Sequence, residues 1–88
     1  MSPRTQDRIE QMESNIAYAI SNICRAAMDA QNGDYSIAMI NLMNAVRWLN
    51  GVCVYQAEID LDERDDLDYK AIFKRAQEIY QERRKNEE

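Results

Sequence analysis

The stretch YSIAMINLMNAVRWLNG, Tyr35 to Gly51, decides the fold of this 88-residue chain. Its apolar positions recur with helical spacing, but they are too numerous to form one narrow stripe. They are Ile37, Ala38, Ile40, Leu42, Ala45, Val46, Trp48 and Leu49. A helix with this pattern must contact neighbours on more than one side, and so short a chain can hardly supply them all. The stretch therefore predicts a helix that takes part in contacts between copies of the chain.

The length of the chain predicts one domain, residues 1–88, and a small margin of stability. A domain of this size buries only about 60–65% of the surface that its unfolded chain exposes, so we expect it to form a homo-oligomer. Cys24 and Cys53 lie inside apolar helical patterns, and no signal-like segment precedes them. Asn, Arg and Gln interrupt the apolar runs well before about 18 residues. We therefore expect a reduced, soluble, cytoplasmic protein without a membrane span.

The charges are unevenly distributed, and the formal net charge is −5. Acids crowd the segment from Glu58 to Asp68, where Arg64 is the one base, whereas basic residues are frequent after Lys70. A nucleic acid duplex would be repelled over much of such a surface. A small anion in a local basic pocket is still compatible with this pattern.

Two segments predict a long helical hairpin. Residues 5–31 carry apolar side chains at three- and four-residue spacing, which is the period of an amphipathic helix. In the QNGDYS stretch that follows, Gly33 tolerates the left-handed conformation of a helix end, and Asp34 or Ser36 can cap the next helix. We expect that helix to run from about Tyr35 to about Ile59, with Gly51 either ending it or packing closely in its middle.

A third helix is predicted after the acidic segment. Its apolar stripe consists of Tyr69, Ile72, Phe73, Ala76, Ile79 and Tyr80. The preceding acids are placed where negative charge favours a helix N-terminus. The tail QERRKNEE, from about residue 81 to residue 88, is polar and is expected to fray. The predicted fold class is therefore all-α, a helical hairpin with a third helix against it.

The sequence lacks the usual parts of catalytic and metal sites. It contains no His, no Cys-x-x-Cys pair and no Gly-rich phosphate loop. The segment DLDERDDLDYK is only superficially similar to a calcium loop, because Arg64 stands at a ligand position and Asp65 stands where the loop needs Gly. We therefore expect a protein that is not an enzyme and that needs no metal or cofactor.

The basic and aromatic side chains each allow two interpretations. Lys70, Lys74 and Arg75 share one side of the third helix, where they either pair with nearby acids or bind a phosphate together with Ser36. Aromatic residues at helical spacing are usually core, although a Tyr beside a helix end, such as Tyr35, can stack on a base.

The segment GDYSIAMINLMNAVRWLNGV, residues 33–52, resembles the helical hairpin of phage anti-defence sponges. These small proteins counter CBASS and Thoeris immunity by sequestering cyclic nucleotide signals. The positions that carry the resemblance are Ser36-Ile37-Ala38-Met39, Leu42, Ala45-Val46 and Trp48-Leu49-Asn50. The match covers roughly a quarter of the chain.

The resemblance implies a function by binding alone. Proteins of this family assemble as hexamers with two-fold and three-fold interfaces, and they hold cyclic dinucleotides or cyclic trinucleotides between protomers. Some relatives capture signals derived from ADP-ribose instead. By this resemblance we expect a phage protein that acts in the host cytoplasm during infection, where it sequesters such signals without cleaving them and so prevents activation of CBASS effectors.

The resemblance also implies two sets of ligand-binding residues. The trinucleotide pocket of the family is similar to what Gly33, Ser36 and the Arg75-Ala76 step could supply. The dinucleotide pocket combines an aromatic residue of the first helix, here Tyr18, with a basic residue at the hairpin turn. This turn has no base, since it reads Asn32-Gly33-Asp34-Tyr35, so Arg25, Arg4 or Arg8 would have to replace it.

A different class of function stays open at this point. Small acidic helical proteins of phages and plasmids often inhibit other proteins, as immunity proteins or as mimics of nucleic acid. The acids between Glu58 and Asp68 would suit a basic surface on such a partner. A structural helical module without a ligand is the third interpretation.

Overall fold

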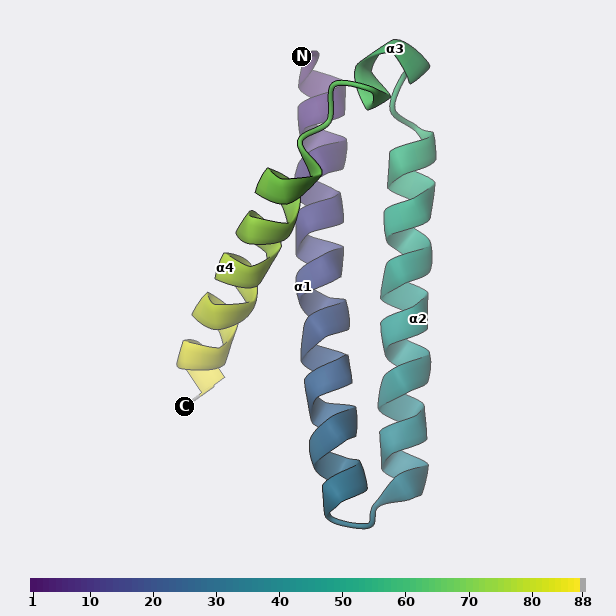
Figure 1. Ribbon diagram of the computed structural model, residues 1–88, viewed down its shortest axis with the longest axis vertical. Helices are drawn as coiled ribbons and strands as arrows, with labels where there is room; N and C mark the ends of the chain where they lie inside the picture. The colour runs from purple at the N-terminus through teal and green to yellow at the C-terminus, as the bar shows by residue number, and fades with distance from the viewer. Residues whose placement is uncertain (88) are drawn as a thin grey trace.

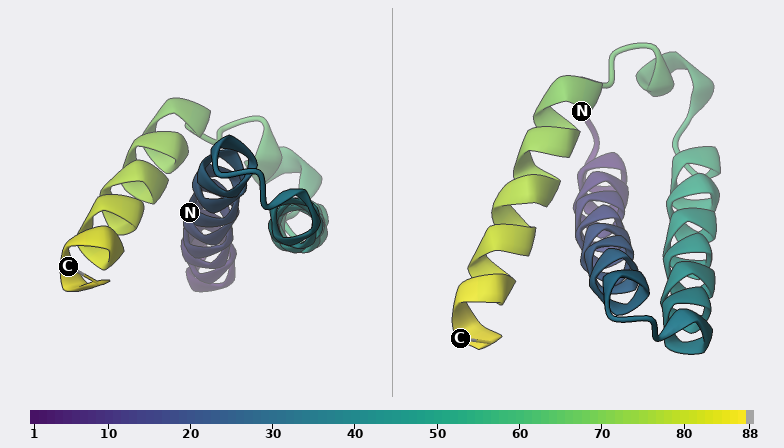
Figure 2. Two further views of the ribbon diagram at one scale, coloured as in Figure 1. Left: turned by 90° about the horizontal axis from the view of Figure 1, so that it is seen from below. Right: turned by 60° about the horizontal axis from the view of Figure 1, so that its bottom comes forward.

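The computed structural model describes residues 1–87 and is entirely helical, with no strand in that range. The helices are α1 (Pro3–Gln31), α2 (Tyr35–Ala57), α3 (Leu61–Arg64) and α4 (Tyr69–Glu87). The long helices α1 and α2 form an antiparallel hairpin, and α4 runs along the other flank of α1 (Figure 1). Seen from below, α1 lies between α4 and α2 (Figure 2). The predicted all-α hairpin with a further helix against it is confirmed.

The ends of α1 have clear local causes. Ser2 is its N-cap, because the Ser2 hydroxyl accepts a hydrogen bond of 3.1 Å from the backbone N–H of Thr5. Pro3 occupies the first turn, where its missing N–H costs nothing. At the other end, Gly33 turns the chain with a φ of 83°, as the sequence predicts. Asp34 is at the N-cap position of α2, but its side chain makes no capping hydrogen bond.

The main core lies between α1, α4 and the segments that join α2 to α4. Its buried side chains are Ile9, Met12, Ile16, Ile59, Leu67, Ile72 and Ala76. The α1 and α4 members recur at three- and four-residue spacing, so each helix turns one stripe toward the other. This packing explains why α4 holds its place beside the N-terminal half of α1.

The hairpin interface is built on small side chains. Within α2 the buried residues are Ala38 and Ala45. Gly51 packs closely in the middle of α2, because a Cβ atom added there would lie 2.6 Å from the Asn15 amide nitrogen. Of the two roles that the sequence allowed for Gly51, the structure shows close packing rather than the end of the helix. Small residues let α1 and α2 approach, but they bury little of α2.

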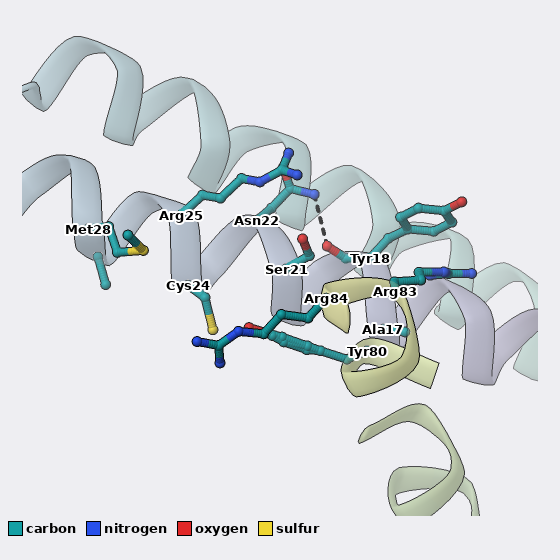
Figure 3. A pocket seen from close by; sticks show the side chains of 11 residues that line it. Ala17, Tyr18, Ser21, Asn22, Cys24, Arg25, Met28, Tyr80, Arg83 and Arg84 are labelled. Atoms are coloured by element: carbon teal, nitrogen blue, oxygen red, sulfur yellow. Dashed lines mark hydrogen bonds between the residues drawn. The ribbon is translucent and has the colours of Figure 1, made fainter. Parts of the chain in front are cut away.

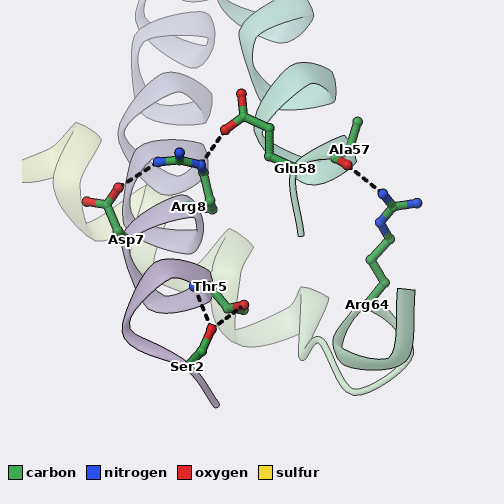
Figure 4. A network of polar contacts seen from close by, with 7 residues as sticks. All are labelled: Ser2, Thr5, Asp7, Arg8, Ala57, Glu58 and Arg64. Atoms are coloured by element: carbon green, nitrogen blue, oxygen red, sulfur yellow. Dashed lines mark hydrogen bonds and ion pairs between the residues drawn. The ribbon is translucent and has the colours of Figure 1, made fainter. Parts of the chain in front are cut away.

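The short helix α3 was not predicted from the sequence, and it closes the end of the molecule near the N-terminus (Figure 1). Arg64 donates from Nη2 to the carbonyl of Ala57 at 2.7 Å (Figure 4). It also donates from Nε to the carbonyl of Ile59 at 3.0 Å. Ala57 is the last residue of α2, whose final carbonyls lack partners within the helix, and Ile59 follows directly after the C-cap Glu58. Arg64 therefore ties the α3 turn to the end of α2.

Carboxylates of the acidic segment bind the start of α1. Glu63 accepts hydrogen bonds from the Thr5 hydroxyl and from the backbone N–H of Ser2, the latter at 3.2 Å. Glu58 forms an ion pair with Arg8 (Figure 4). The guanidinium of Arg8 also lies 5.8 Å from the centre of the Tyr55 ring. Part of the acidic segment therefore has a structural role within the chain.

Two expectations from the sequence need correction. The tail from about residue 81 was expected to fray, but α4 continues as a helix through Glu87; residue 88 lies outside the described residues. By length and composition alone, α2 is also apolar enough to cross a membrane, although we expected no such helix. The interrupting Asn and Arg residues are too few to offset its Ile, Leu, Val and Met side chains. Only 11% of its apolar window is buried in the protomer.

Candidate anion-binding pocket

A pocket of about 680 Å³ lies between the C-terminal half of α1 and the C-terminal half of α4 (Figure 3). Its lining consists of Ala17, Tyr18, Ser21, Asn22, Cys24, Arg25, Ala27, Met28, Tyr80, Arg83 and Arg84. The pocket is within the size range of small-molecule sites in proteins. We call it the arginine pocket.

Helical periodicity brings these side chains together. Tyr18, Asn22 and Arg25 follow one another at spacings of four and three on α1, so they share one side of that helix. On α4, Arg83 and Arg84 lie three and four residues after Tyr80, which places them on the same side as Tyr80. Since α4 diverges from α1 toward its C-terminus (Figure 1), the two sets face each other across an opening rather than a packed core.

The charge of the arginine pocket differs from that of the whole chain. Three arginines line it, and no carboxylate belongs to its described lining. The chain as a whole has 16 acidic and 11 basic residues. The guanidinium groups carry their positive charge at any physiological pH and present donors that match phosphate and carboxylate oxygens. The pocket is therefore a local positive site on an acidic protein.

Tyr18 links three helices at the edge of the arginine pocket. Its ring stacks on Trp48 of α2, with ring centres 4.5 Å apart and planes inclined by 19°. The guanidinium carbon of Arg83, from α4, lies 3.9 Å from the centre of the same ring. Arg83 in turn donates from Nη2 to the Ser14 hydroxyl at 3.0 Å. These contacts fix the orientation of Tyr18 and Arg83.

Tyr80 forms the opposite wall of the pocket, beside Cys24 and Arg84 (Figure 3). The hydrogen bond with Cys24 raises the pKa of Tyr80, and partial burial raises it further. Tyr80 is therefore neutral at physiological pH, and it brings a phenol ring without adding negative charge. A flat aromatic face and nearby cations suit a ligand that combines an aromatic ring with an anionic group.

The structure brings together one of the two predicted residue sets. Tyr18 and Arg25, the expected partners of a dinucleotide, line the same pocket. Sequence analysis missed Tyr80, Arg83 and Arg84 as pocket residues. Arg83 and Arg84 follow Tyr80 by three and four residues, and this spacing indicates one helix face that carries an aromatic ring and two cations. The expectation that residues 81–88 fray hid this pattern, because a frayed segment has no fixed face.

The residues of the predicted trinucleotide set lie apart within one protomer. Gly33, Tyr35 and Ser36 are at the hairpin turn, at one end of α1 (Figure 1). Arg75 lines a separate depression with Gln6, Glu10 and Glu13, residues of the opposite end of α1. A shared site would need these residues from different protomers.

Arg75 and Ala76 are also engaged within the chain. The Arg75 guanidinium forms ion pairs with Glu78 at 3.3 Å and Glu82 at 3.4 Å, and these hydrogen bonds raise its pKa. Burial raises the pKa of the neighbouring Glu13, while Arg75 opposes that shift. The Ala76 side chain is completely buried in the core. Of the two interpretations of this basic residue, pairing with acids is the one seen in the protomer.

Comparisons with protein-family models, with curated proteins and with solved structures each found no match.

Proposed function

We propose that this chain is a phage anti-defence protein that binds cyclic oligonucleotide immune signals and holds them without cleavage, which keeps CBASS effectors inactive in the host cytoplasm. In this proposal it acts as a homo-oligomer, a hexamer, and its ligands are cyclic dinucleotides, cyclic trinucleotides or both. The observation that supports binding of such a signal is the arginine pocket, which gathers three cations and two tyrosines and has no carboxylate among its described lining residues.

The chemistry of the pocket suits a cyclic dinucleotide in particular. Such a ligand carries two phosphates and two flat bases. A guanidinium group can donate two parallel charge-assisted hydrogen bonds to one phosphate. The pocket contains three guanidinium groups, those of Arg25, Arg83 and Arg84. The ring of Tyr80 offers an aromatic face for stacking on a base, which every nucleobase allows. Both faces of the Tyr18 ring are already covered, one by Trp48 and the other by the Arg83 guanidinium, so Tyr18 contributes to the wall of the pocket rather than a stacking face. Ser21 and Asn22 add hydrogen-bonding groups for base or ribose edges.

Sequestration requires high affinity but no chemical step. A protein that competes with an immune receptor for its signal needs a dissociation constant near the nanomolar range, which corresponds to about −12 kcal/mol. Scattered surface charges do not provide such binding, because exposed ion pairs are weak and are screened by salt. A concave site with convergent cations is the kind of surface that can provide it.

The test is calorimetric titration of the purified protein with a panel of cyclic dinucleotides and cyclic trinucleotides. We expect at least one of them to bind near the nanomolar range. Arg25→Glu should weaken cyclic dinucleotide binding by roughly 100-fold or more, because it replaces a phosphate partner with a repelling charge. Arg47→Glu is the matched control, since Arg47 is exposed on α2 and does not line the pocket, and the change in net charge is the same.

Three results would contradict the proposal. Equal losses for Arg25→Glu and Arg47→Glu would mean that net charge rather than the pocket governs binding. Recovery of linear or hydrolysed nucleotide after heat denaturation of the complex would reveal turnover, whereas we expect the intact ring. No binding across the panel would favour the protein-inhibitor interpretation of the acidic segment.

A further inference from the structure

The exposed side of α2 carries a heptad pattern. Counting from the start of the helix, apolar side chains alternate at spacings of four and three, which is the repeat of a two-helix seam. The positions are Tyr35, Met39, Leu42, Val46, Leu49 and Cys53, and we call this set the α2 seam. All six side chains are exposed in the protomer. A period of 3.5 residues is the period that keeps one face against another helix.

The exposure and charge of the α2 seam fit a self-contact. Five of its six side chains are large and are 42–71% exposed: Tyr35, Met39, Leu42, Val46 and Leu49. Covering them with another copy of the chain is favourable, because it removes their apolar surface from water. Arg47 is the one charged residue of α2, and it is outside the α2 seam. Two copies can therefore meet here without placing like charges in the contact, although each chain is acidic.

We propose that the α2 seam is covered by the α2 seam of a second copy of this chain, packed antiparallel around a two-fold axis. The proposal deepens the homo-oligomer part of the proposed function by naming the contact surface. The contact between α2 helices can be tested independently of ligand binding, because the arginine pocket is lined by residues of α1 and α4.

The antiparallel direction follows from the register of the seam. If residue numbers facing each other add up to 88, Tyr35 meets the partner's Cys53, Met39 meets the partner's Leu49, and Leu42 meets the partner's Val46. Every layer is then apolar on both sides. The next heptad position, Gln56, falls beyond the start of the partner's α2. In a parallel pair, Gln56 would face its own copy, and the two helix dipoles would repel rather than attract.

A membrane is the competing occupant of α2, and the sequence pattern argues against it. A helix in lipid has no need of a 3.5-residue repeat, and α2 also carries Asn44, Arg47 and Asn50 away from its contact with α1. The net charge of −5 would in addition repel an anionic membrane surface.

The test compares Val46→Glu with Val54→Glu by sedimentation velocity over a range of micromolar concentrations. Both valines are 55% exposed on α2, but only Val46 belongs to the seam, so the two variants are closely matched. We expect Val46→Glu to raise the self-dissociation constant roughly 30-fold or more, as central interface positions do, with unchanged helical content. Val54→Glu should have a much smaller effect. Equal effects of the two substitutions, or a wild-type chain that is monomeric at these concentrations, would overturn the proposal.

Cysteine cross-linking tests the direction of packing. In a Cys24→Ser and Cys53→Ser background, the added pair Met39→Cys and Leu49→Cys should give covalent dimers on mild oxidation, whereas neither of these two substitutions alone should, because the antiparallel register places position 39 opposite position 49 of the partner. Cys24→Ser alone should not, since Cys53 would face the partner's Tyr35. Efficient dimerisation through Cys53 alone would indicate a parallel pair. Co-sedimentation of wild type with vesicles of phosphatidylcholine and phosphatidylglycerol, lost equally in both glutamate variants, would assign α2 to a membrane instead.

Discussion

At the scale of single residues, Tyr18 has two roles that can be separated. Its ring is held between contributions from α2 and α4, and it also lines the arginine pocket. Tyr18→Ala should lower the free energy of unfolding by about 2 kcal/mol, because ring stacking and the cation–π contact are lost together. Tyr18→Phe keeps the ring and should stay within about 0.5 kcal/mol of wild type. Urea unfolding of the three proteins measures both values, and a Phe variant as unstable as the Ala variant would refute the role of the ring.

Also at the scale of single residues, a substitution of Arg75 should affect the binding of cyclic trinucleotides but not that of cyclic dinucleotides. Arg75→Ala should leave cyclic dinucleotide affinity unchanged within about twofold, because Arg75 does not line the arginine pocket. If trinucleotides are held where Gly33, Ser36 and Arg75 of different protomers converge, the same variant should abolish their binding. Calorimetry with both ligand classes distinguishes the outcomes. Trinucleotide binding that survives in Arg75→Ala would show that this residue transfer from the resemblance is wrong.

At the scale of elements, the contact between α3 and the start of α1 should be sensitive to acid. Hydrogen bonds from Thr5 and then Ser2 lower the pKa of Glu63 below its usual value of 4.5, so its ionised form favours the folded state. That contribution is complete above the unfolded-state pKa, and it is lost as the pH falls through the lowered value of the folded state.

The corresponding variant is Glu63→Gln. It should lower the thermal midpoint at about pH 7, and the difference from wild type should shrink at a pH well below 4.5, as the pH falls through the lowered pKa of the wild-type carboxylate. Asp62→Asn is the control in the same turn, because Asp62 is exposed. Circular dichroism melts at the two pH values provide the measurement. A difference that stays constant with pH would mean that the charge of Glu63 is not what binds the two elements.

At the scale of elements, the helices differ in whether the sequence predicts them. The three long helices were predictable because their stripes of apolar residues extend over more than three turns. The four-residue α3 was not, since its position depends on Arg64, Glu63 and Ser2, which are distant from one another in sequence or act through backbone carbonyls. Tyr18 and Arg25 were foreseen together, but only as parts of a family resemblance.

The pairing of charges was the least predictable feature. In the acidic segment, Glu58, Glu63 and Asp68 each have a partner within the chain, and the Asp68 carboxylate caps α4 by accepting from the Ala71 backbone N–H at 3.0 Å. A one-dimensional charge pattern cannot distinguish such acids from those that face solvent. The segment therefore presents fewer unpaired carboxylates to a basic protein partner than its composition indicates, which weakens the protein-inhibitor alternative.

At the scale of the whole molecule, the protomer is longer and thinner than a compact domain. Its radius of gyration is 14.7 Å, and its extents are 47 × 24 × 17 Å. A compact chain of this length would have a radius of gyration of about 12 Å. Three helices lying side by side leave both broad faces and the outer side of α2 open (Figure 2). This shape supports the proposal that the protomer is one part of a larger assembly.

The arginine pocket and the α2 seam belong to different helices, and this determines how many ligand molecules the protein can hold. Residues of α1 and α4 line the arginine pocket, whereas the α2 seam belongs to α2, so joining two chains through the seam neither creates nor removes a pocket of this kind. For a ligand of the arginine pocket, the number of binding sites then equals the number of chains made, at any degree of association. Such a protein titrates its ligand: the free signal stays low until the pockets are full, and it then rises steeply. In infected cells, the outcome would depend on whether synthesis of the protein or synthesis of the signal reaches the larger number of molecules first.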